Sequence, residues 1–363
     1  MVTKSIKEAE KQEKGADILN RLKDLATHSY SKFVLKKAGF YLIVIFIALT
    51  FVFAIPRFMP GDPATRMLRP PPTGTDPARL AQFNEIREAM NAFYGLDKPL
   101  HEQYVDFWIH ILQFDLGSSY TYYPRTVVEI ALPRLIYSLV LALPVLFISF
   151  FLGNWIGGRA AFLKGRLNDL VYLFSIIAAN APFYWLGIII FIYFVTGDNI
   201  FLSHPGGISP NISRDLSWEF IIDTLRHYFP AFLTLIIVMT GGWATGMRAM
   251  TLYEKESEYL LYAKQMGFRT RTMRRYAQRN AILPQFTGLN LRLNELIGMT
   301  IIIENIFLWP GIGTLAGQAI GSQDYPLVIG TFLVTLVVVI IGNFFVDITY
   351  GFLDPRIKTG HGG

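Results

Sequence analysis

The 363-residue sequence contains no cysteine and few charged residues. The absence of cysteine excludes disulfide bonds, thiolate metal ligands and a cysteine nucleophile. Charged residues make up 17% of the chain, whereas an ordinary soluble protein carries roughly 25%. Hydrophobic residues make up 52% and aromatic residues 15%, which is more apolar surface than one soluble core would bury. These proportions indicate an integral membrane protein in contact with membrane lipid.

Several sequence features of other protein classes are also missing. No Gly-x-x-x-x-Gly-Lys-Ser/Thr phosphate loop and no catalytic pair occurs, and the six histidines are too scattered to indicate a metal site. No internal repeat is evident, which disfavours folds built from inverted halves. The net charge of +6 could indicate nucleic acid, but the apolar composition makes a membrane surface the better interpretation. We therefore expect no cofactor, no metal, no nucleic-acid partner and no enzymatic activity in this chain.

Six stretches are long and apolar enough to cross a membrane, which takes about 20 residues. They are residues 39–59, 135–157, 170–195, 229–247, 286–309 and 327–350. The sequence therefore predicts an all-α integral membrane protein with six transmembrane helices. The leader before the first stretch is too long and too mixed in charge to be a cleaved signal peptide.

Lys and Arg residues are concentrated in alternate connections between these stretches. The leader 1–38 and the connection 248–285 are strongly basic, whereas the connections 196–226 and 310–326 are not. Basic connections stay in the cytoplasm. We therefore predict a multi-pass protein of the plasma or inner membrane with both termini cytoplasmic, including the tail 351–363.

The connection 60–134 is predicted to lie outside the cell. It is too long for a simple turn. We expect it to form a small external subdomain with a short helix at residues 76–93. Exposed acidic and aromatic residues on this side are candidates for contact with an external protein. These candidates are Glu102, Asp106, Trp309 and Asp324.

The cytoplasmic stretch 258–284 predicts two short amphipathic helices joined by a glycine hinge. Gly267 can adopt a positive φ and end the first helix. Thr270 is predicted to cap the second helix, and Pro284 is predicted to stop it at the membrane. The alternative is a basic anchor that only obeys the charge rule for cytoplasmic segments.

This stretch resembles the EAA loop of ABC importer permeases of the dipeptide/oligopeptide type. The matching positions are Glu258, Tyr259, Ala263, Gly267, Arg279, Asn280, Ala281 and Pro284. Further matching motifs occur at residues 60–63, 94–97, 115–119, 182–187, 304–313, 324–326 and 353–356. Tyr276 departs from the family pattern, which usually has histidine there.

The resemblance implies a type I ABC importer permease fold and specific partners. A second homologous permease would complete the channel, and an extracytoplasmic substrate-binding protein would deliver the substrate. Two cytoplasmic ABC ATPases would bind ATP and Mg²⁺ and dock on the matched EAA positions. In this interpretation the chain itself is a permease and catalyses no reaction.

Polar residues inside the predicted spans are candidates for the translocation pathway. Pro182 is predicted to kink the third span, with Asn180 satisfying backbone groups nearby. Arg292 and Glu295 are three residues apart and are predicted to pair, with a further contact from Arg292 to Asp347 at a similar depth. The remaining candidates are Glu304 and Asn343. A purely structural clamp between helices is the alternative for these residues.

Three other functions remain open on the sequence. The same importer could carry oligosaccharides, because selectivity in such systems resides largely in the binding protein. An ion-coupled secondary transporter would use intramembrane carboxylates. An EAA-like loop has no role in such a carrier, and this feature favours the importer. A membrane-embedded enzyme is disfavoured because no nucleophile–base pair lies in a span.

Overall fold

The computed structural model describes residues 28–58, 72, 76–93, 95, 97–196, 205–209, 212 and 217–353. The predicted basic leader up to residue 27 and most of the predicted tail lie outside the described residues. The described part is helical, with one isolated β-bridge between Ser118 and Thr126. The prediction of an all-α protein is confirmed.

Four helices are individually long and apolar enough to cross a membrane. They are α2 (His28–Phe58), α6 (Val127–Ala160), α9 (Trp218–Lys255) and α14 (Tyr325–Leu353). Two bent helix pairs also qualify, which gives up to six spans if each pair counts as one. The first pair is α7 (Arg166–Asn180) and α8 (Phe183–Phe191), and α8 continues into a π-helical turn, η1 (Ile192–Thr196). The second pair is α12 (Leu289–Phe307) and α13 (Ile312–Ser322).

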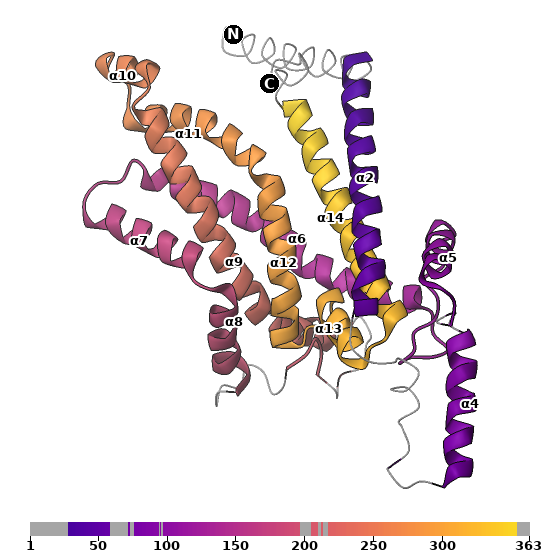
Figure 1. Ribbon diagram of the computed structural model, residues 1–363. Helices are drawn as coiled ribbons and strands as arrows, with labels where there is room; N and C mark the ends of the chain where they lie inside the picture. Colours follow the sequence, from indigo (N-terminus) through magenta and orange to yellow (C-terminus); the bar gives the residue numbers. More distant parts are fainter. Residues whose placement is uncertain are drawn as a thin grey trace.

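Four shorter helices complete the described part of the fold. They are α4 (Pro77–Phe93), α5 (Leu100–Leu112), α10 (Glu258–Gln265) and α11 (Thr270–Thr287). Figure 1 shows α10 and α11 at the end where α2 begins and α14 ends, whereas α4 and α13 lie at the opposite end. The predicted short helix at residues 76–93 is confirmed as α4, with Pro77 at its first position, where the missing N–H costs nothing.

The hydrophobic core surrounds α9, which contacts α6, α7, α8, α11 and α12. Leu141 of α6, Leu235 and Met239 of α9, and Leu296 and Ile303 of α12 are fully buried there. Helix α2 packs outside this core, mainly against α14. Its outward face carries exposed leucine, isoleucine and phenylalanine side chains, as expected for a helix in contact with lipid.

The third predicted span is broken rather than kinked. Helix α7 ends at Asn180, α8 begins at Phe183, and the two axes differ by 94°. Pro182 lacks an N–H and disfavours helical geometry at the preceding residue, and Ala181 is extended (φ −61°, ψ 131°). Asn180 Nδ2 donates to the Ile176 carbonyl (2.9 Å) in the last turn of α7. The predicted bend at Pro182 is therefore confirmed in position, but it separates two helices instead of kinking one continuous helix.

Two predicted boundaries of the second cytoplasmic helix are also wrong. Pro284 lies inside α11, which continues to Thr287. A proline in a helix removes one hydrogen bond and need not end the helix, because its φ is compatible with the α conformation. The position before α11 is occupied by Arg269, and no side chain caps this end. Thr270 is the first helical residue and is not the cap.

Candidate functional site

Helices α9, α10 and α11 are joined by three polar side chains. The Tyr259 hydroxyl donates to Glu254 Oε2 (2.5 Å), and Asn280 Nδ2 donates to the Tyr259 hydroxyl (2.9 Å) and to Glu254 Oε2 (3.3 Å). Burial and the bond to Glu254 raise the pKa of the Tyr259 phenol. Each helix contributes one residue, so these bonds fix the position of α10 on the bundle.

The turn after α10 is closed by the glycine that the sequence singled out. Gly267 has a φ of 77°, which confirms the predicted positive φ. Its N–H donates to the Lys264 carbonyl (3.0 Å), and the Phe268 N–H donates to the Ala263 carbonyl (3.0 Å). This pair of bonds is the Schellman arrangement, which satisfies the last carbonyls of a helix and needs a left-handed residue. The hinge is therefore a defined turn.

One face of α10 is buried against the bundle and the other is open. Leu260 and Ala263 are buried, whereas Glu258 of α10 and Arg279 of α11 are exposed. Exposed apolar side chains cover α10 and its hinge: Leu261, Tyr262, Met266 and Phe268. Exposed apolar groups gathered on one small element mark a protein contact surface.

A ladder of polar contacts links α12 and α14 in the half of the bundle nearer α10 and α11. Asn290 Nδ2 donates to Asp347 Oδ1 (2.6 Å), and Asn343 Nδ2 donates to Asn294 Oδ1 (3.0 Å). Asn290 and Asn294 are four residues apart on α12, as are Asn343 and Asp347 on α14. Residues four apart share one face of a helix, so both pairs form where these two faces meet.

The Asp347 carboxylate also ties α2 to this ladder. The Tyr41 hydroxyl donates to its Oδ2 (2.9 Å), and Lys37 Nζ lies 2.8 Å from the same oxygen. Asp347 therefore holds together α2, α12 and α14, and its negative charge is compensated by a lysine from the outermost of the three helices.

The predicted pairing of Arg292 is half correct. Its guanidinium bonds Glu295 (2.7 Å), as predicted. The predicted contact with Asp347 is wrong, because Arg292 lies against α9, with its guanidinium 5.7 Å from the Trp243 ring centre. Asn290 faces α14. Arg292 comes two residues later and therefore lies about 200° further around α12, on the side away from α14.

Glu304 and Trp309 build the turn between α12 and α13 and do not face open space. Glu304 is fully buried, and its Oε2 accepts the Gly313 N–H (2.7 Å). Trp309 is fully buried too, and its Nε1 donates to the Tyr137 carbonyl (3.1 Å). This geometry therefore supports neither the pathway role predicted for Glu304 nor the surface role predicted for Trp309.

Asp324 is a buried cap rather than a surface residue. Its carboxylate accepts the Ser119 hydroxyl (2.5 Å), the Thr121 N–H (2.8 Å) and the Leu327 N–H (3.1 Å). The last bond caps the first turn of α14, a role that aspartate favours. The other two bonds attach the segment between α5 and α6 to α14. The predicted docking role of Asp324 is wrong because the side chain is fully buried.

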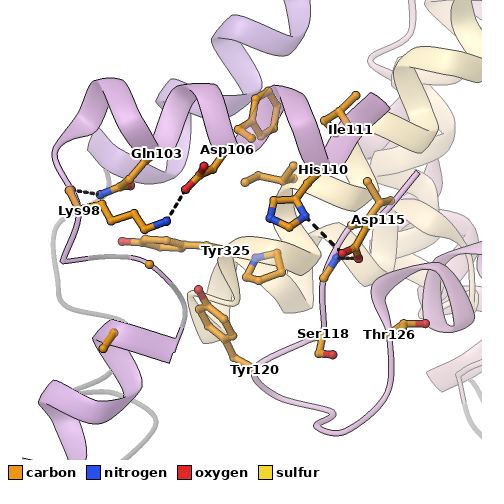
Figure 2. A pocket seen from close by; sticks show the side chains of 17 residues that line it. Lys98, Gln103, Asp106, His110, Ile111, Asp115, Ser118, Tyr120, Thr126 and Tyr325 are labelled. Carbon is orange, nitrogen blue, oxygen red and sulfur yellow. Dashed lines mark hydrogen bonds and ion pairs between the residues drawn. The ribbon is translucent and has the colours of Figure 1, made fainter. Parts of the chain in front are cut away.

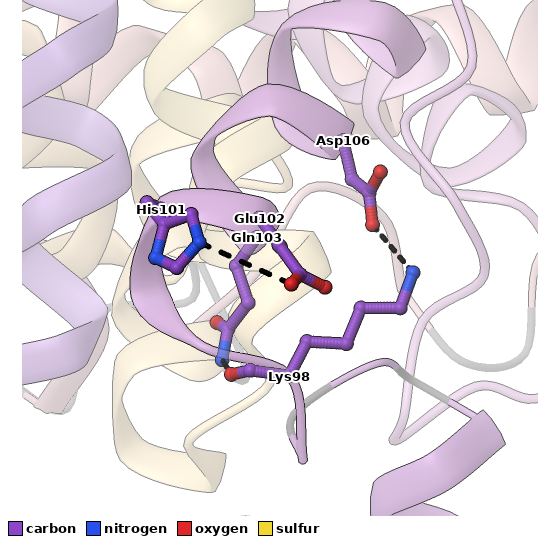
Figure 3. A network of polar contacts seen from close by, with 5 residues as sticks. All are labelled: Lys98, His101, Glu102, Gln103 and Asp106. Atoms are coloured by element: carbon purple, nitrogen blue, oxygen red, sulfur yellow. Dashed lines mark hydrogen bonds and ion pairs between the residues drawn. The ribbon is translucent and has the colours of Figure 1, made fainter.

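The other two acidic candidates lie on α5, where Glu102 is exposed and Asp106 is half-buried. Figure 3 shows them in a polar network in which Lys98 bonds Asp106 (2.6 Å) and His101 lies 3.9 Å from Glu102. The Asp106 hydrogen bond raises the pKa of the Lys98 ammonium. Gln103 Nε2 donates to the Lys98 carbonyl (2.8 Å), which fixes the turn before α5.

A cavity of about 510 Å³ lies between α5, the following loop and the start of α14. In Figure 2, Lys98 and Asp106 point toward one another on one side of it, with Tyr120 and Tyr325 below them. His110 Nδ1 lies 3.3 Å from Asp115 at the other side. The cavity thus combines charged and aromatic side chains at the end of the molecule opposite α10.

Comparison with known proteins identifies the architecture that carries these sites. Residues 149–359, which hold both α10–α11 and the α12–α14 ladder, match the family described as binding-protein-dependent transport system inner membrane component. The chain belongs to this family. The permease is therefore a multi-pass membrane protein of a binding-protein-dependent transport system, and its family is a transport component rather than a catalytic one.

Relatives of the permease cover most of its length. It is 30% identical over 310 residues to the oligopeptide transport system permease protein AppB of Bacillus subtilis, covering 84% of this chain and 92% of the relative. It is 30% identical to the di/tripeptide transport system permease protein DppB of Pseudomonas aeruginosa, covering 90% and 98%. It is 27% identical to the glutathione transport system permease protein GsiC of Salmonella typhi, also covering 90% and 98%.

Sequence reasoning missed several residues that the permease uses. Glu254 accepts hydrogen bonds from both Tyr259 and Asn280. Its position at the end of α9, next to α10, could have predicted this contact. Asn290 and Asn294 are four residues apart on α12, the same spacing as Asn343 and Asp347 on α14. The same four-residue spacing of polar side chains on two apolar helices would have predicted the polar contacts between α12 and α14. Within the described residues, no group of three histidine or acidic side chains could hold a metal ion.

Proposed function

We propose that this chain is the transmembrane permease subunit of an ATP-driven importer for di- or oligopeptides. The observation that carries the proposal is the α10–α11 unit, in which a bonded triad and a closed glycine turn hold an exposed apolar face outward. We name this face, formed by Leu261, Tyr262, Met266 and Phe268, the coupling face. An autonomous carrier would have no use for such a unit. The peptide substrate is supported by the names of relatives that cover most of the chain, since glutathione is itself a tripeptide.

The coupling face is the proposed dock for an ATPase subunit. An apolar helix on a rigid mount transmits displacement to α9 and α11, because Glu254, Tyr259 and Asn280 connect the three helices. Glu258, Ala263, Gly267, Arg279 and Pro284 complete the predicted coupling set. Two ATPases would dock on two permeases, one of them this chain, and would bind ATP and Mg²⁺ themselves.

The proposed orientation places α10 and α11 in the cytoplasm. Helix α11 carries four arginines and no acidic residue, and α2 begins at the same end with Lys36 and Lys37. Basic residues of short connections remain on the cytoplasmic side. Both termini would then be cytoplasmic, and α4, α5 and α13 would lie outside.

The opposite end is the proposed landing surface for the substrate-binding protein. Glu102 and Asp106 remain candidates because neither side chain is buried, unlike Trp309 and Asp324, and Asp106 lines the charged cavity. Along the pathway, we propose that Asn180, Pro182, Arg292, Glu295, Asn343 and Asp347 serve an inner gate. The exposed Arg292–Glu295 pair could exchange partners when the ATPases close.

The test uses the complete complex in proteoliposomes, with ATP hydrolysis and uptake of labelled short peptides as readouts. Tyr262→Asp places a charge on the coupling face and should abolish ATPase retention on the permease together with uptake. Tyr123→Asp is the matched control, because both tyrosines are 63% exposed and Tyr123 lies far from α10. The control should retain the ATPase.

Two results would overturn the proposal. Full ATPase retention and uptake by Tyr262→Asp would show that the coupling face is not a dock. Uptake of an oligosaccharide without uptake of any short peptide would reject the peptide assignment while leaving the importer role in place.

A further inference from the structure

Helices α6 and α7 both pack against α9 but diverge from each other, and a groove remains between them. Its volume is about 560 Å³. Its lining is mostly apolar and includes Trp155, Leu170 and Phe174, and the polar residues in it are Arg159, Ser175 and Thr240. The outward parts of Trp155, Leu170 and Phe174 are more than half exposed, so this groove opens on the side of the bundle.

Arg159 lies at the end of this groove where α6 turns toward α7. Its guanidinium stacks on the Trp155 ring, 3.8 Å from the ring centre. Across the described part of the chain, it forms no ion pair with a carboxylate. Stacking uses the face of the guanidinium and leaves its N–H groups directed outward in the plane.

The surroundings of Arg159 are strongly positive. Residues 159–169 contain the cations Arg159, Lys164 and Arg166 and the single acid Asp169. Helix α9 adds two further cations. Arg248 stacks on Tyr172 of α7 (3.9 Å to the ring centre), and Lys255 Nζ donates to the Ala161 carbonyl (3.5 Å). Arg159 is thus the cation that lines the groove, and further cations lie on the adjoining parts of α7, α9 and the connection after α6.

We propose that this groove binds an anionic phospholipid, with an acyl chain between α6, α7 and α9 and the phosphate on Arg159. A guanidinium forms bidentate bonds to phosphate oxygens, and basic pockets between transmembrane helices on the cytoplasmic side suit anionic headgroups. An apolar helix of a partner protein would fill the groove but would leave the guanidinium unpaired. A free phosphate would pair with Arg159 but would leave the groove empty. A phospholipid satisfies both, and this holds whichever solute the protein transports.

Trp155 provides a direct probe of the groove. The assembled complex is placed in nanodiscs of phosphatidylcholine, and phosphatidylglycerol with brominated acyl chains is titrated in. Bromine quenches nearby tryptophan, and the signal of Trp155 is the difference between the wild type and Trp155→Phe. We expect saturable quenching by brominated phosphatidylglycerol at low mole fraction, and weaker, non-saturating quenching by brominated phosphatidylcholine.

Matched variants separate a site from diffuse attraction. Arg159→Gln should weaken the phosphatidylglycerol titration about tenfold, the loss of one charge-assisted contact. Lys164→Gln removes an equal charge from the same connection without touching the groove and should change it less than about twofold. Leu170→Ala with Phe174→Ala removes exposed wall atoms and should weaken the binding of both lipids. Inorganic phosphate should not displace the bound lipid.

The proposal fails under any of three outcomes. Equal titrations for the two headgroups would remove the role of charge. Equal losses in Arg159→Gln and Lys164→Gln would show diffuse attraction only. Absence of Trp155 quenching in the complex, with quenching in the isolated full-length chain, would show that a partner subunit covers the groove. If Arg159→Gln fails to fold, the wild-type comparison of the two headgroups still decides.

Discussion

The two ends of the helix bundle hold their acidic residues in different ways. At the end near α13, Glu304 and Asp324 are fully buried and accept hydrogen bonds from backbone N–H groups. At the end near α10, Asp347 and Glu295 are partly exposed and are bonded to side chains of α2 and α12. The first arrangement fixes turns, whereas the second joins side chains that can change partners.

The difference has a physical basis in desolvation. Hydrogen bonds to a buried carboxylate offset the cost of its desolvation, and removing one leaves a buried polar group unpaired at a cost of about 1–3 kcal/mol. A partly hydrated pair exchanges its partner for water at little cost. If α10 and α11 are the proposed docking unit, a rigid frame near α13 beside an adjustable half near α10 suits a protein in which motion begins at these two helices.

Asp324→Ala should give the largest effect and tests the rigid end. The change removes the cap of α14 and leaves the Ser119 hydroxyl and the Thr121 N–H without their acceptor. We expect a loss of about 3 kcal/mol in unfolding free energy, measured as a lower thermal unfolding midpoint of the purified protein. Asp106→Ala, at an acid that is not buried, is the control. Equal midpoints for the two variants would contradict the distinction between the ends.

Gly267→Val should give an intermediate and local effect. The left-handed geometry at φ 77° costs a residue with a side chain about 1–2 kcal/mol, and the branched side chain adds strain. We expect reduced ATP-coupled uptake with little change in the global unfolding midpoint. Gly267→Asn is the informative control, because asparagine adopts this geometry more readily. Coupling that is normal in Gly267→Val would reject the hinge assignment.

Arg292 substitutions test whether the Arg292–Glu295 pair is adjustable. Because the pair is exposed, Arg292→Ala should cost less than about 1 kcal/mol in stability while it lowers the uptake rate. Arg292→Glu should be rescued by Glu295→Arg, which restores the observed contact, and not by Asp347→Arg. Rescue by the second change instead would mean that another arrangement of these helices governs transport. Normal uptake by Arg292→Ala would remove the gate role.

The smallest expected effect is the titration of Lys98. The Asp106 bond raises the pKa of this amine, so its contribution to stability is complete below the ordinary lysine pKa and is lost as pH rises through the higher folded value. Competitive amine labelling in alkaline buffer should therefore modify Lys98 more slowly than Lys164. Asp106→Asn should remove the difference. Identical labelling rates in the wild type would show that the surface pair does not persist in solution.

Part of this structure follows from local patterns that any reader of the sequence can find. Long apolar stretches predicted the membrane helices, because the bilayer requires a fixed length of apolar residues wherever the helix lies in the fold. Gly267 was predicted to take a positive φ, since the end of α10 is determined by a few consecutive residues. The Arg292–Glu295 pair was predictable for the same reason, as both residues belong to one turn of helix.

Only the tertiary structure decided which polar residues are buried and which partners they find. Asp324 and Trp309 looked like surface residues because they flank a loop, yet segments distant in the sequence, at Ser119 and Tyr137, close over them. Arg292 and Asp347 have similar depths, but rotation around α12 directs Asn290 to Asp347 and Arg292 toward α9. Burial and partner choice depend on how helices pack, which residues near in sequence do not encode.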